Sequence, residues 1–105
     1  MSDKRLLLST TASREDAQSI ALTLVSHRIA ACVNIVGPIE STYRWKGEVE
    51  TAQEYLLMIK TTAERVPTLR EELRRVHPYE LPELVELSIE GGLPEYLEWI
   101  GESVR

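Results

Sequence analysis

The segment Ile39-Glu40-Ser41-Thr42-Tyr43-Arg44-Trp45-Lys46-Gly47-Glu48-Val49 joins two halves of this chain, each of which predicts a strand, a helix and a strand. Its larger apolar and aromatic side chains alternate with charged and polar ones, which is typical of a β-strand with two different faces. The alternation stops at Lys46-Gly47-Glu48, which predicts a tight hairpin turn. A long strand then runs from about Val49 to Thr61, with its apolar part at residues 55–59.

The half before this hairpin predicts a strand, a helix and a second strand. Residues 6–8 form an apolar run that indicates a strand buried on both faces, and residues 30–36 form a second buried run. Between them, Ser13 and Asp16 form a capping pattern at the start of an amphipathic helix over residues 14–28. Gly37-Pro38 interrupts the second strand and predicts a bend or bulge there.

The half after the hairpin repeats this order. Thr62 is a candidate cap for a second helix, which ends at about Val76 because Pro78 follows closely. Residues 84–89 form the fourth predicted strand, and Gly91-Gly92 ends it. A short terminal helix is indicated by the apolar spacing of Leu93, Leu97, Ile100 and Val104.

Two such units joined by a hairpin predict an α+β fold, the ferredoxin-like split βαβ sandwich. We expect a single domain over residues 1–105, with an antiparallel sheet and helices on one face. The hairpin strands are long for a domain of this size, so they overshoot the core and expose backbone groups with Tyr43 and Trp45. Because exposed sheet edges are usually paired or covered, we expect a homo-oligomer whose subunits share a sheet edge.

Composition limits the partners and the compartment. The chain has 105 residues, a net charge of −5 and a pI of about 5.1, which argues against a nucleic-acid partner because phosphate binding needs a basic surface. No stretch approaches the ~20 apolar residues of a membrane span, and the first ten residues lack a signal-peptide pattern. The single cysteine, Cys32, excludes an intrachain disulfide. We therefore expect a cytoplasmic protein without a membrane partner.

The candidate metal ligands are Cys32, His77 and His27, with oxygen donors at Glu80 and Glu83. No two of them have the local spacing of a metal motif, so a site would have to be assembled by folding or oligomerisation. Both leading candidates also have structural explanations. A cysteine in an apolar strand is commonly a core residue, and a histidine at a helix C-terminus can serve as a cap.

The segment His77-Pro78-Tyr79-Glu80-Leu81-Pro82-Glu83 is stiffened by two prolines. It suits either a preformed site or a rigid connector between a helix and a strand. Aromatic and charged side chains here and on the strand ends are typical of small-ligand clefts, while packing between subunits is the alternative. The candidate cleft residues are Tyr43, Trp45, Lys60, Tyr79 and Glu80.

Catalysis has little support in the sequence. The chain has no Gly-x-Ser-x-Gly elbow and no glycine-rich phosphate loop. Acyl-phosphate hydrolases share the ferredoxin-like fold, but the turn at residues 10–13 is followed by Arg14 as its only cation. This activity is kept as a weaker alternative, and no organic cofactor is expected.

Four segments resemble the CutA divalent-cation tolerance proteins in order and spacing, and Tyr96-Leu97 and Trp99-Ile100 fit the C-terminus of that family. The segments are residues 31–35, 41–48, 59–61 and 77–83. The resemblance implies a ferredoxin-like subunit in a homotrimer that resembles the PII signalling proteins. It also implies a non-enzymatic, cytoplasmic role in tolerance of copper and other divalent cations, with no defined protein partner.

The resemblance carries over only in part to a metal site. Some family members have a copper site made of a cysteine on the first strand and two adjacent histidines, and these positions hold Ser9, Val76 and His77 here. A site using His77 and Cys32 is the remaining metal hypothesis. The alternative is a PII-like sensor that binds a small anionic or nucleotide ligand in intersubunit clefts lined by Lys60, Tyr79 and Glu80.

Overall fold

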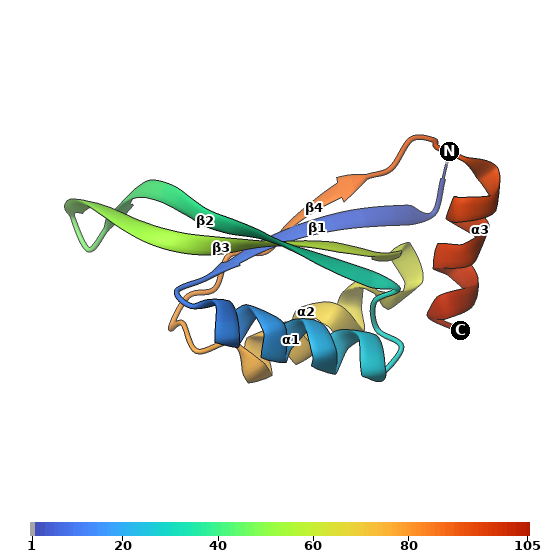
Figure 1. The fold of residues 1–105 in the computed structure, drawn as a ribbon, viewed down its shortest axis with the longest axis horizontal. Coiled ribbons are helices and arrows are strands. Elements are labelled where there is room, and N and C mark those ends of the chain that lie inside the picture. The colour runs from blue at the N-terminus through green and yellow to red at the C-terminus, as the bar shows by residue number, and fades with distance from the viewer. Residues whose placement is uncertain (1) are drawn as a thin grey trace.

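The computed structural model describes residues 2–105, in which four strands form one sheet beside three α-helices (Figure 1). The elements are β1 (Lys4–Thr11), α1 (Arg14–Ser26), β2 (Cys32–Trp45), β3 (Glu48–Thr62), α2 (Val66–Val76), β4 (Val85–Ser88) and α3 (Pro94–Ser103), with a short 3-10 turn, η1 (Ala63–Arg65), before α2. No helix within residues 2–105 is long and apolar enough to cross a membrane.

The sheet has the strand order β2-β3-β1-β4, and each neighbouring pair is antiparallel. Helices α1 and α2 both cover the same face of it, while α3 lies at the end opposite the hairpin tip (Figure 1). This arrangement confirms the predicted ferredoxin-like α+β fold.

The hydrophobic core lies between the sheet and the two covering helices. Leu7, Leu57 and Ile59 point from the central strands toward the helices and are at most 1% exposed. Their partners on the helices include Leu24 and Leu69, which are fully buried. Burying a side chain of this size stabilises the fold by roughly 1.5–3 kcal/mol.

No helix within residues 2–105 covers the opposite face of the sheet, so the prediction that residues 6–8 are buried on both faces is wrong for one subunit. Leu7 is buried under the helices, whereas Leu6 and Leu8 on the other side of β1 are only half-buried. We call this uncovered side the open face. Its apolar members are Leu6, Leu8, Val36, Leu56, Met58, Val85 and Leu87.

The helix starts were predicted with mixed success. The Ser13 hydroxyl accepts a 3.1 Å hydrogen bond from the backbone N–H of Asp16, which confirms the cap of α1. Thr62 does not cap α2, because η1 intervenes and the Thr62 side chain makes no capping bond. Pro67 lies in the first turn of α2, where its missing N–H has no helical partner to lose.

The hairpin projects well beyond the core (Figure 1). The last residue of β1, Thr11, pairs with Tyr55, so residues 48–54 of β3 pair only with β2. The predicted irregularity is present as a register shift between Val36 and Ile39, where the Gly37–Pro38 peptide bond is cis. Lys46 and Gly47 have φ angles of 51° and 83°, the conformation of a two-residue hairpin turn.

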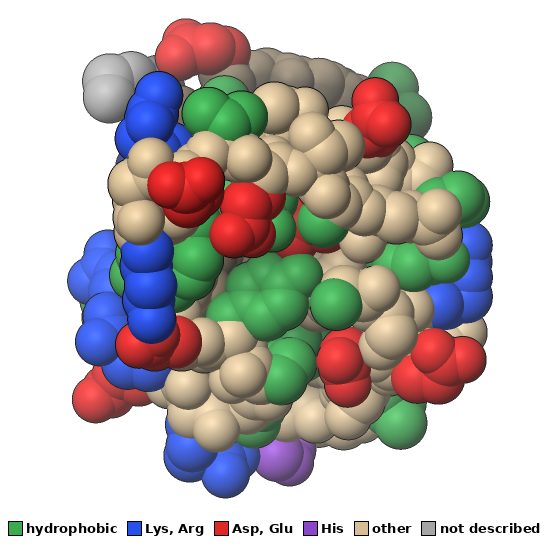
Figure 2. All heavy atoms as spheres, turned by 90° about the vertical axis from the view of Figure 1, so that its left-hand side faces the viewer, with side chains coloured by type: hydrophobic (Ala, Val, Ile, Leu, Met, Phe, Trp, Pro, Cys, Tyr) green, Lys and Arg blue, Asp and Glu red, His purple; other side chains and the backbone are tan. Residues whose placement is uncertain are grey.

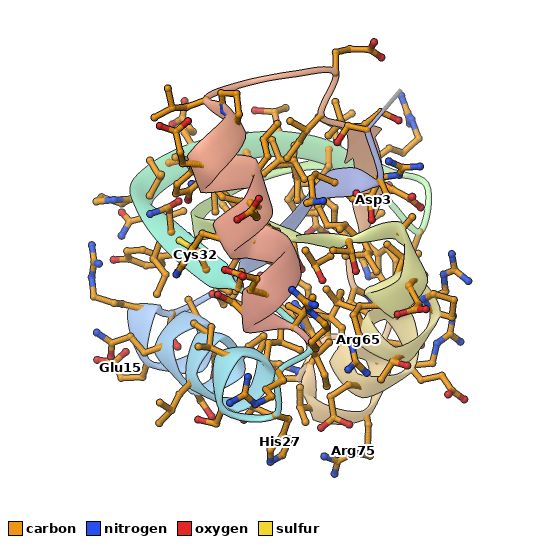
Figure 3. All side chains as sticks on the ribbon, turned by 90° about the vertical axis from the view of Figure 1, so that its right-hand side faces the viewer. Asp3, Glu15, His27, Cys32, Arg65 and Arg75 are labelled. Carbon is orange, nitrogen blue, oxygen red and sulfur yellow. The ribbon has the colours of Figure 1, made fainter. Side chains whose placement is uncertain are left out.

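Helix α3 closes the end of the sheet away from the hairpin. The buried residue Ile100 of α3 and Val104, which directly follows the helix, pack with Ala31 as a second small core. The Arg65 Nε donates a 2.7 Å hydrogen bond to the carbonyl oxygen of Val104, which fixes the end of α3 to the turn before α2 (Figure 3).

Candidate functional site

Residues 77–84 link α2 to β4, and we call this segment the connector. A groove of about 1080 Å³ lies between the projecting hairpin and the connector. Figure 2 views the molecule from the hairpin side and shows hydrophobic side chains near the centre with acidic side chains around them. The groove is lined by residues of β1, β2, β3, the connector and the start of β4: Thr10, Ser41, Thr42, Tyr43, Trp45, Glu50, Glu54, residues 78–84 and Val85.

The connector wall is fixed to β1 by His77. His77 is 7% exposed, and its Nε2 lies 2.8 Å from the carbonyl oxygen of Thr10. Its Nδ1 accepts a 3.1 Å hydrogen bond from the backbone N–H of Tyr79. A neutral ring with its proton on Nε2 satisfies both contacts, because that nitrogen donates while Nδ1 accepts. Both ring nitrogens are therefore used within the chain.

The connector is joined to the hairpin by Tyr79. Its phenolic O–H donates a 2.6 Å hydrogen bond to Oε2 of Glu54 on β3. Burial and then this bond to a carboxylate raise the pKa of the Tyr79 phenol well above its usual value near 10. The phenol is therefore a stable donor throughout the physiological range, and the base of the groove is closed by a neutral O–H facing a carboxylate.

The charge of the groove is negative. Four glutamates line it, two on β3 and two on the connector: Glu50, Glu54, Glu80 and Glu83. No lysine or arginine is among its described lining residues. At the rim, Lys46 Nζ lies 3.9 Å from Oε2 of Glu80, and both of these side chains are 72% exposed.

Glu54 differs from the other three glutamates because it is only 7% exposed. Within residues 2–105, no basic side chain lies within ion-pair distance of it. A buried carboxylate is costly unless it is paired or well hydrogen-bonded. The groove thus contains a buried negative charge held by the Tyr79 hydrogen bond without a counter-cation.

The structure brings together four of the five predicted cleft residues, namely Tyr43, Trp45, Tyr79 and Glu80. Lys60 is not among them. It pairs across the sheet with Cys32 and Leu6, far along β3 from Glu54, and its Nζ donates to Asn34 Oδ1 at 2.9 Å. The Lys60 ammonium therefore belongs to the open face near α3 and does not supply the groove with a cation.

The two predicted metal ligands, His77 and Cys32, lie apart within one chain. His77 contacts Thr10, whereas Cys32 is at the level of Leu6, four residues away along β1. Four residues of a strand span about 13 Å, and β2 and β1 are also separated by β3. One subunit does not form a metal site from this pair. Over residues 2–105, no three His, Cys, Asp or Glu side chains are grouped closely enough to hold a metal ion.

The sequence interpretation missed Glu50 and Glu54. Their signal was present, since Glu48, Glu50 and Glu54 occupy even-numbered positions of one strand and therefore share a face. Glu54 also directly precedes the apolar run at 55–59, an unusual place for a solvated charge. What the pattern did not show was that the connector would fold back over this face.

The fold and the groove define a ferredoxin-like α+β protein with an acidic, aromatic-lined site at the edge of its sheet. The chain belongs to the CutA1 divalent ion tolerance protein family, whose model matches residues 5–103.

Relatives support this assignment in sequence and in structure. The chain is 48% identical over 100 residues to the divalent-cation tolerance protein CutA of Thermus thermophilus, covering 95% of this chain and 97% of that protein. It is 44% identical to the human protein CutA, covering 87% of this chain but 51% of the human protein. The crystal structure of CutA from Xylella fastidiosa superposes with a TM-score of 0.96 at 43% identity, covering 99% of this chain and 100% of that one.

Proposed function

We propose that the chain acts as a non-enzymatic, homotrimeric divalent-cation tolerance protein, and that the groove carboxylates bind the cation. The observation that carries the proposal is Glu54, a buried carboxylate that lines the groove without a counter-cation. A bound cation would offset the cost of burying this charge. The name of the Thermus thermophilus relative, a divalent-cation tolerance protein, supports the same class of ligand.

The donor set of the groove favours hard divalent cations such as Mn²⁺ over copper. Carboxylate oxygens suit Mg²⁺, Ca²⁺ and Mn²⁺, whereas copper favours imidazole and sulfur ligands. His77 has both ring nitrogens engaged, and Cys32 lies on the open face. Because one chain holds no preformed cluster in its described part, cation binding must draw the groove carboxylates together or use a second subunit.

The open face supports the homotrimer. Val85 and Leu87 on β4 are 47% and 43% exposed, and they adjoin Leu6 and Leu8 in the sheet. An apolar sheet face of this kind is normally covered. Sedimentation should give the mass of a trimer, and Met58→Asp should shift it toward monomer. A wild-type monomer at micromolar concentration would contradict this part of the proposal.

Cation binding is tested by isothermal titration of Mn²⁺, Zn²⁺ and Cu²⁺ into wild type and Glu54→Gln. Glu71→Gln, an exposed carboxylate on α2, is the matched control. We expect saturable Mn²⁺ binding that Glu54→Gln weakens and Glu71→Gln leaves unchanged. Equal binding by the two variants, or no saturable heat with wild type, would rule out the groove as the cation site.

The cytoplasmic location stays a prediction, since relatives include proteins described as chloroplastic and periplasmic.

A further inference from the structure

The groove pairs aromatic rings with carboxylates. Tyr43 on β2 is directly opposite Glu50 on β3, and the side chains of such cross-strand partners lie on the same side of the sheet. At the inner end a second aromatic side chain adjoins a carboxylate, because the phenolic O–H of Tyr79 donates a hydrogen bond to Glu54. A ring face next to a carboxylate suits an organic ammonium better than a bare metal ion, because the ring attracts the cation and also packs against its carbon chain.

The mouth of the groove already holds an ammonium of this kind. The Lys46 Nζ lies 5.6 Å from the centroid of the Trp45 ring and 3.9 Å from Oε2 of Glu80. The cation thus sits beside both a ring and a carboxylate. Since Lys46 and Glu80 are each 72% exposed, their pairing is weak and a soluble cation can replace it.

The inner end of the groove offers a second cation position. Glu54 is 7% exposed, lines the groove and forms no ion pair within the described residues. Glu50 lies four residues along the same strand, about 13 Å away at the rise of a β-strand. The negative groups are therefore spread along the groove, and Leu81 and Pro82 of the connector add apolar surface to its lining.

We propose that the groove binds linear polyamines, and that Lys46 occupies the outer ammonium position when no ligand is present. The ammonium groups of the ligand pair with Glu54 inside and with Glu80 at the mouth, while its methylene chain packs on the aromatic walls. This ligand class goes beyond divalent cations and uses the rings of Tyr43 and Trp45, which a metal ion does not need.

The test is a fluorescence titration with spermidine at fixed ionic strength. Trp99→Phe serves as the background, because it leaves Trp45 as the only tryptophan reporter. Spermidine should change the Trp45 fluorescence in a saturable way. The binding affinity should be about tenfold or more lower in Glu54→Gln, because a charge-assisted contact is lost. Lys46→Ala should bind about two- to fivefold more tightly, in line with loss of a weak exposed ion pair.

Controls separate this proposal from charge effects and from metal binding. Glu71→Gln removes the same charge far from the groove and should bind like the background. Trp45→Leu should weaken the binding of spermidine but leave the binding of Mn²⁺ unchanged. Because this variant lacks the tryptophan reporter, its binding is measured by calorimetry. A linear response, equal affinity in Glu54→Gln and Glu71→Gln, or a groove filled by a basic side chain of a second copy would each overturn the polyamine proposal.

Discussion

The phenolic O–H of Tyr79 donates a 2.6 Å hydrogen bond to Oε2 of Glu54 and so joins two segments that are 25 residues apart in the chain. One belongs to the proline-rich connector after α2 and the other to the long strand β3. The contact closes the inner end of the groove. It also holds the projecting hairpin against the connector, so its loss should affect both stability and the site.

Replacing Tyr79 by Phe removes the donor and leaves the buried carboxylate of Glu54 without its hydrogen bond. We expect a loss of about 1–3 kcal/mol in the free energy of unfolding at pH 7, measured by urea denaturation. Tyr43→Phe is the control, because the Tyr43 phenol is 40% exposed and makes no hydrogen bond within residues 2–105. A Tyr79→Phe protein as stable as Tyr43→Phe would show that the contact contributes little.

The same contact predicts a pH dependence at the alkaline end. The folded state raises the pKa of Tyr79 above its unfolded value near 10, so it favours the protonated phenol. This contribution to stability is complete below pH 10 and declines as the pH rises above that value. Denaturation of wild type and Tyr79→Phe between pH 8 and about pH 11 should show a decline that is steeper in wild type. Parallel curves would exclude Tyr79 as its source.

His77 should act as a structural residue whether or not metal is present. Alanine at this position leaves the Thr10 carbonyl and the Tyr79 N–H without partners, at a cost of about 1–3 kcal/mol or more. His27→Ala, at an exposed position after α1, should change stability by less than about 0.5 kcal/mol. The difference between the two variants should be the same with a chelator and with Zn²⁺. A difference that disappears with the chelator would instead identify His77 as a metal ligand.

Two buried hydroxyls should respond in opposite directions to removal. Ser9 is fully buried and its Oγ has no hydrogen-bond partner within residues 2–105, whereas the Thr61 Oγ1 donates a 2.7 Å bond to the carbonyl of Ile29. Ser9→Ala should raise the free energy of unfolding by about 1 kcal/mol, because an unsatisfied polar group leaves the core. Thr61→Val should lower it by about 1 kcal/mol. Equal destabilisation by both would mean that Ser9 has a partner in solution.

Truncating a side chain on the helix-covered face of the sheet should lower the stability of the protein, whereas truncating one on the outer surface of α1 should not. Leu57 is fully buried in β3, so Leu57→Ala should cost about 2–5 kcal/mol. Leu22 is 71% exposed on α1, and Leu22→Ala should change stability by less than about 0.5 kcal/mol. Thermal unfolding followed by circular dichroism measures both. A large loss in Leu22→Ala would reveal that α1 is covered in the assembly.

The fold was readable from sequence because local signals agreed with the global arrangement. The Ser13 cap, the turn at Lys46-Gly47 and the break before Pro78 each set an element boundary through short-range chemistry. What failed was the burial of the apolar strands. A run such as Leu6-Leu7-Leu8 shows that both faces avoid water, but it cannot show whether helices of the same chain or another subunit cover the second face.

The site was only partly predictable because it depends on how distant segments meet. Tyr79 and Glu80 stood out through their stiff, proline-flanked segment, and Tyr43 and Trp45 through their exposed hairpin. Lys60 lies outside the groove of a single chain, six residues beyond Glu54 on the continuous strand β3, and the sequence did not show that the groove would form at the Glu54 end of that strand. Glu54 was overlooked because its burial arises from the connector, a contact that no local pattern encodes.

The projecting hairpin gives the molecule a part whose order should depend on dilution. Residues 48–54 of β3 have a strand on one side only, while the rest of β3 lies between β1 and β2. If neighbouring subunits supply the missing side, amide hydrogen exchange in this arm should speed up as the protein is diluted below its assembly threshold. The amides of β1 should keep their slow exchange at the same dilution. Exchange in residues 48–54 of β3 would then report association of the subunits, and exchange in β1 would report folding of each subunit.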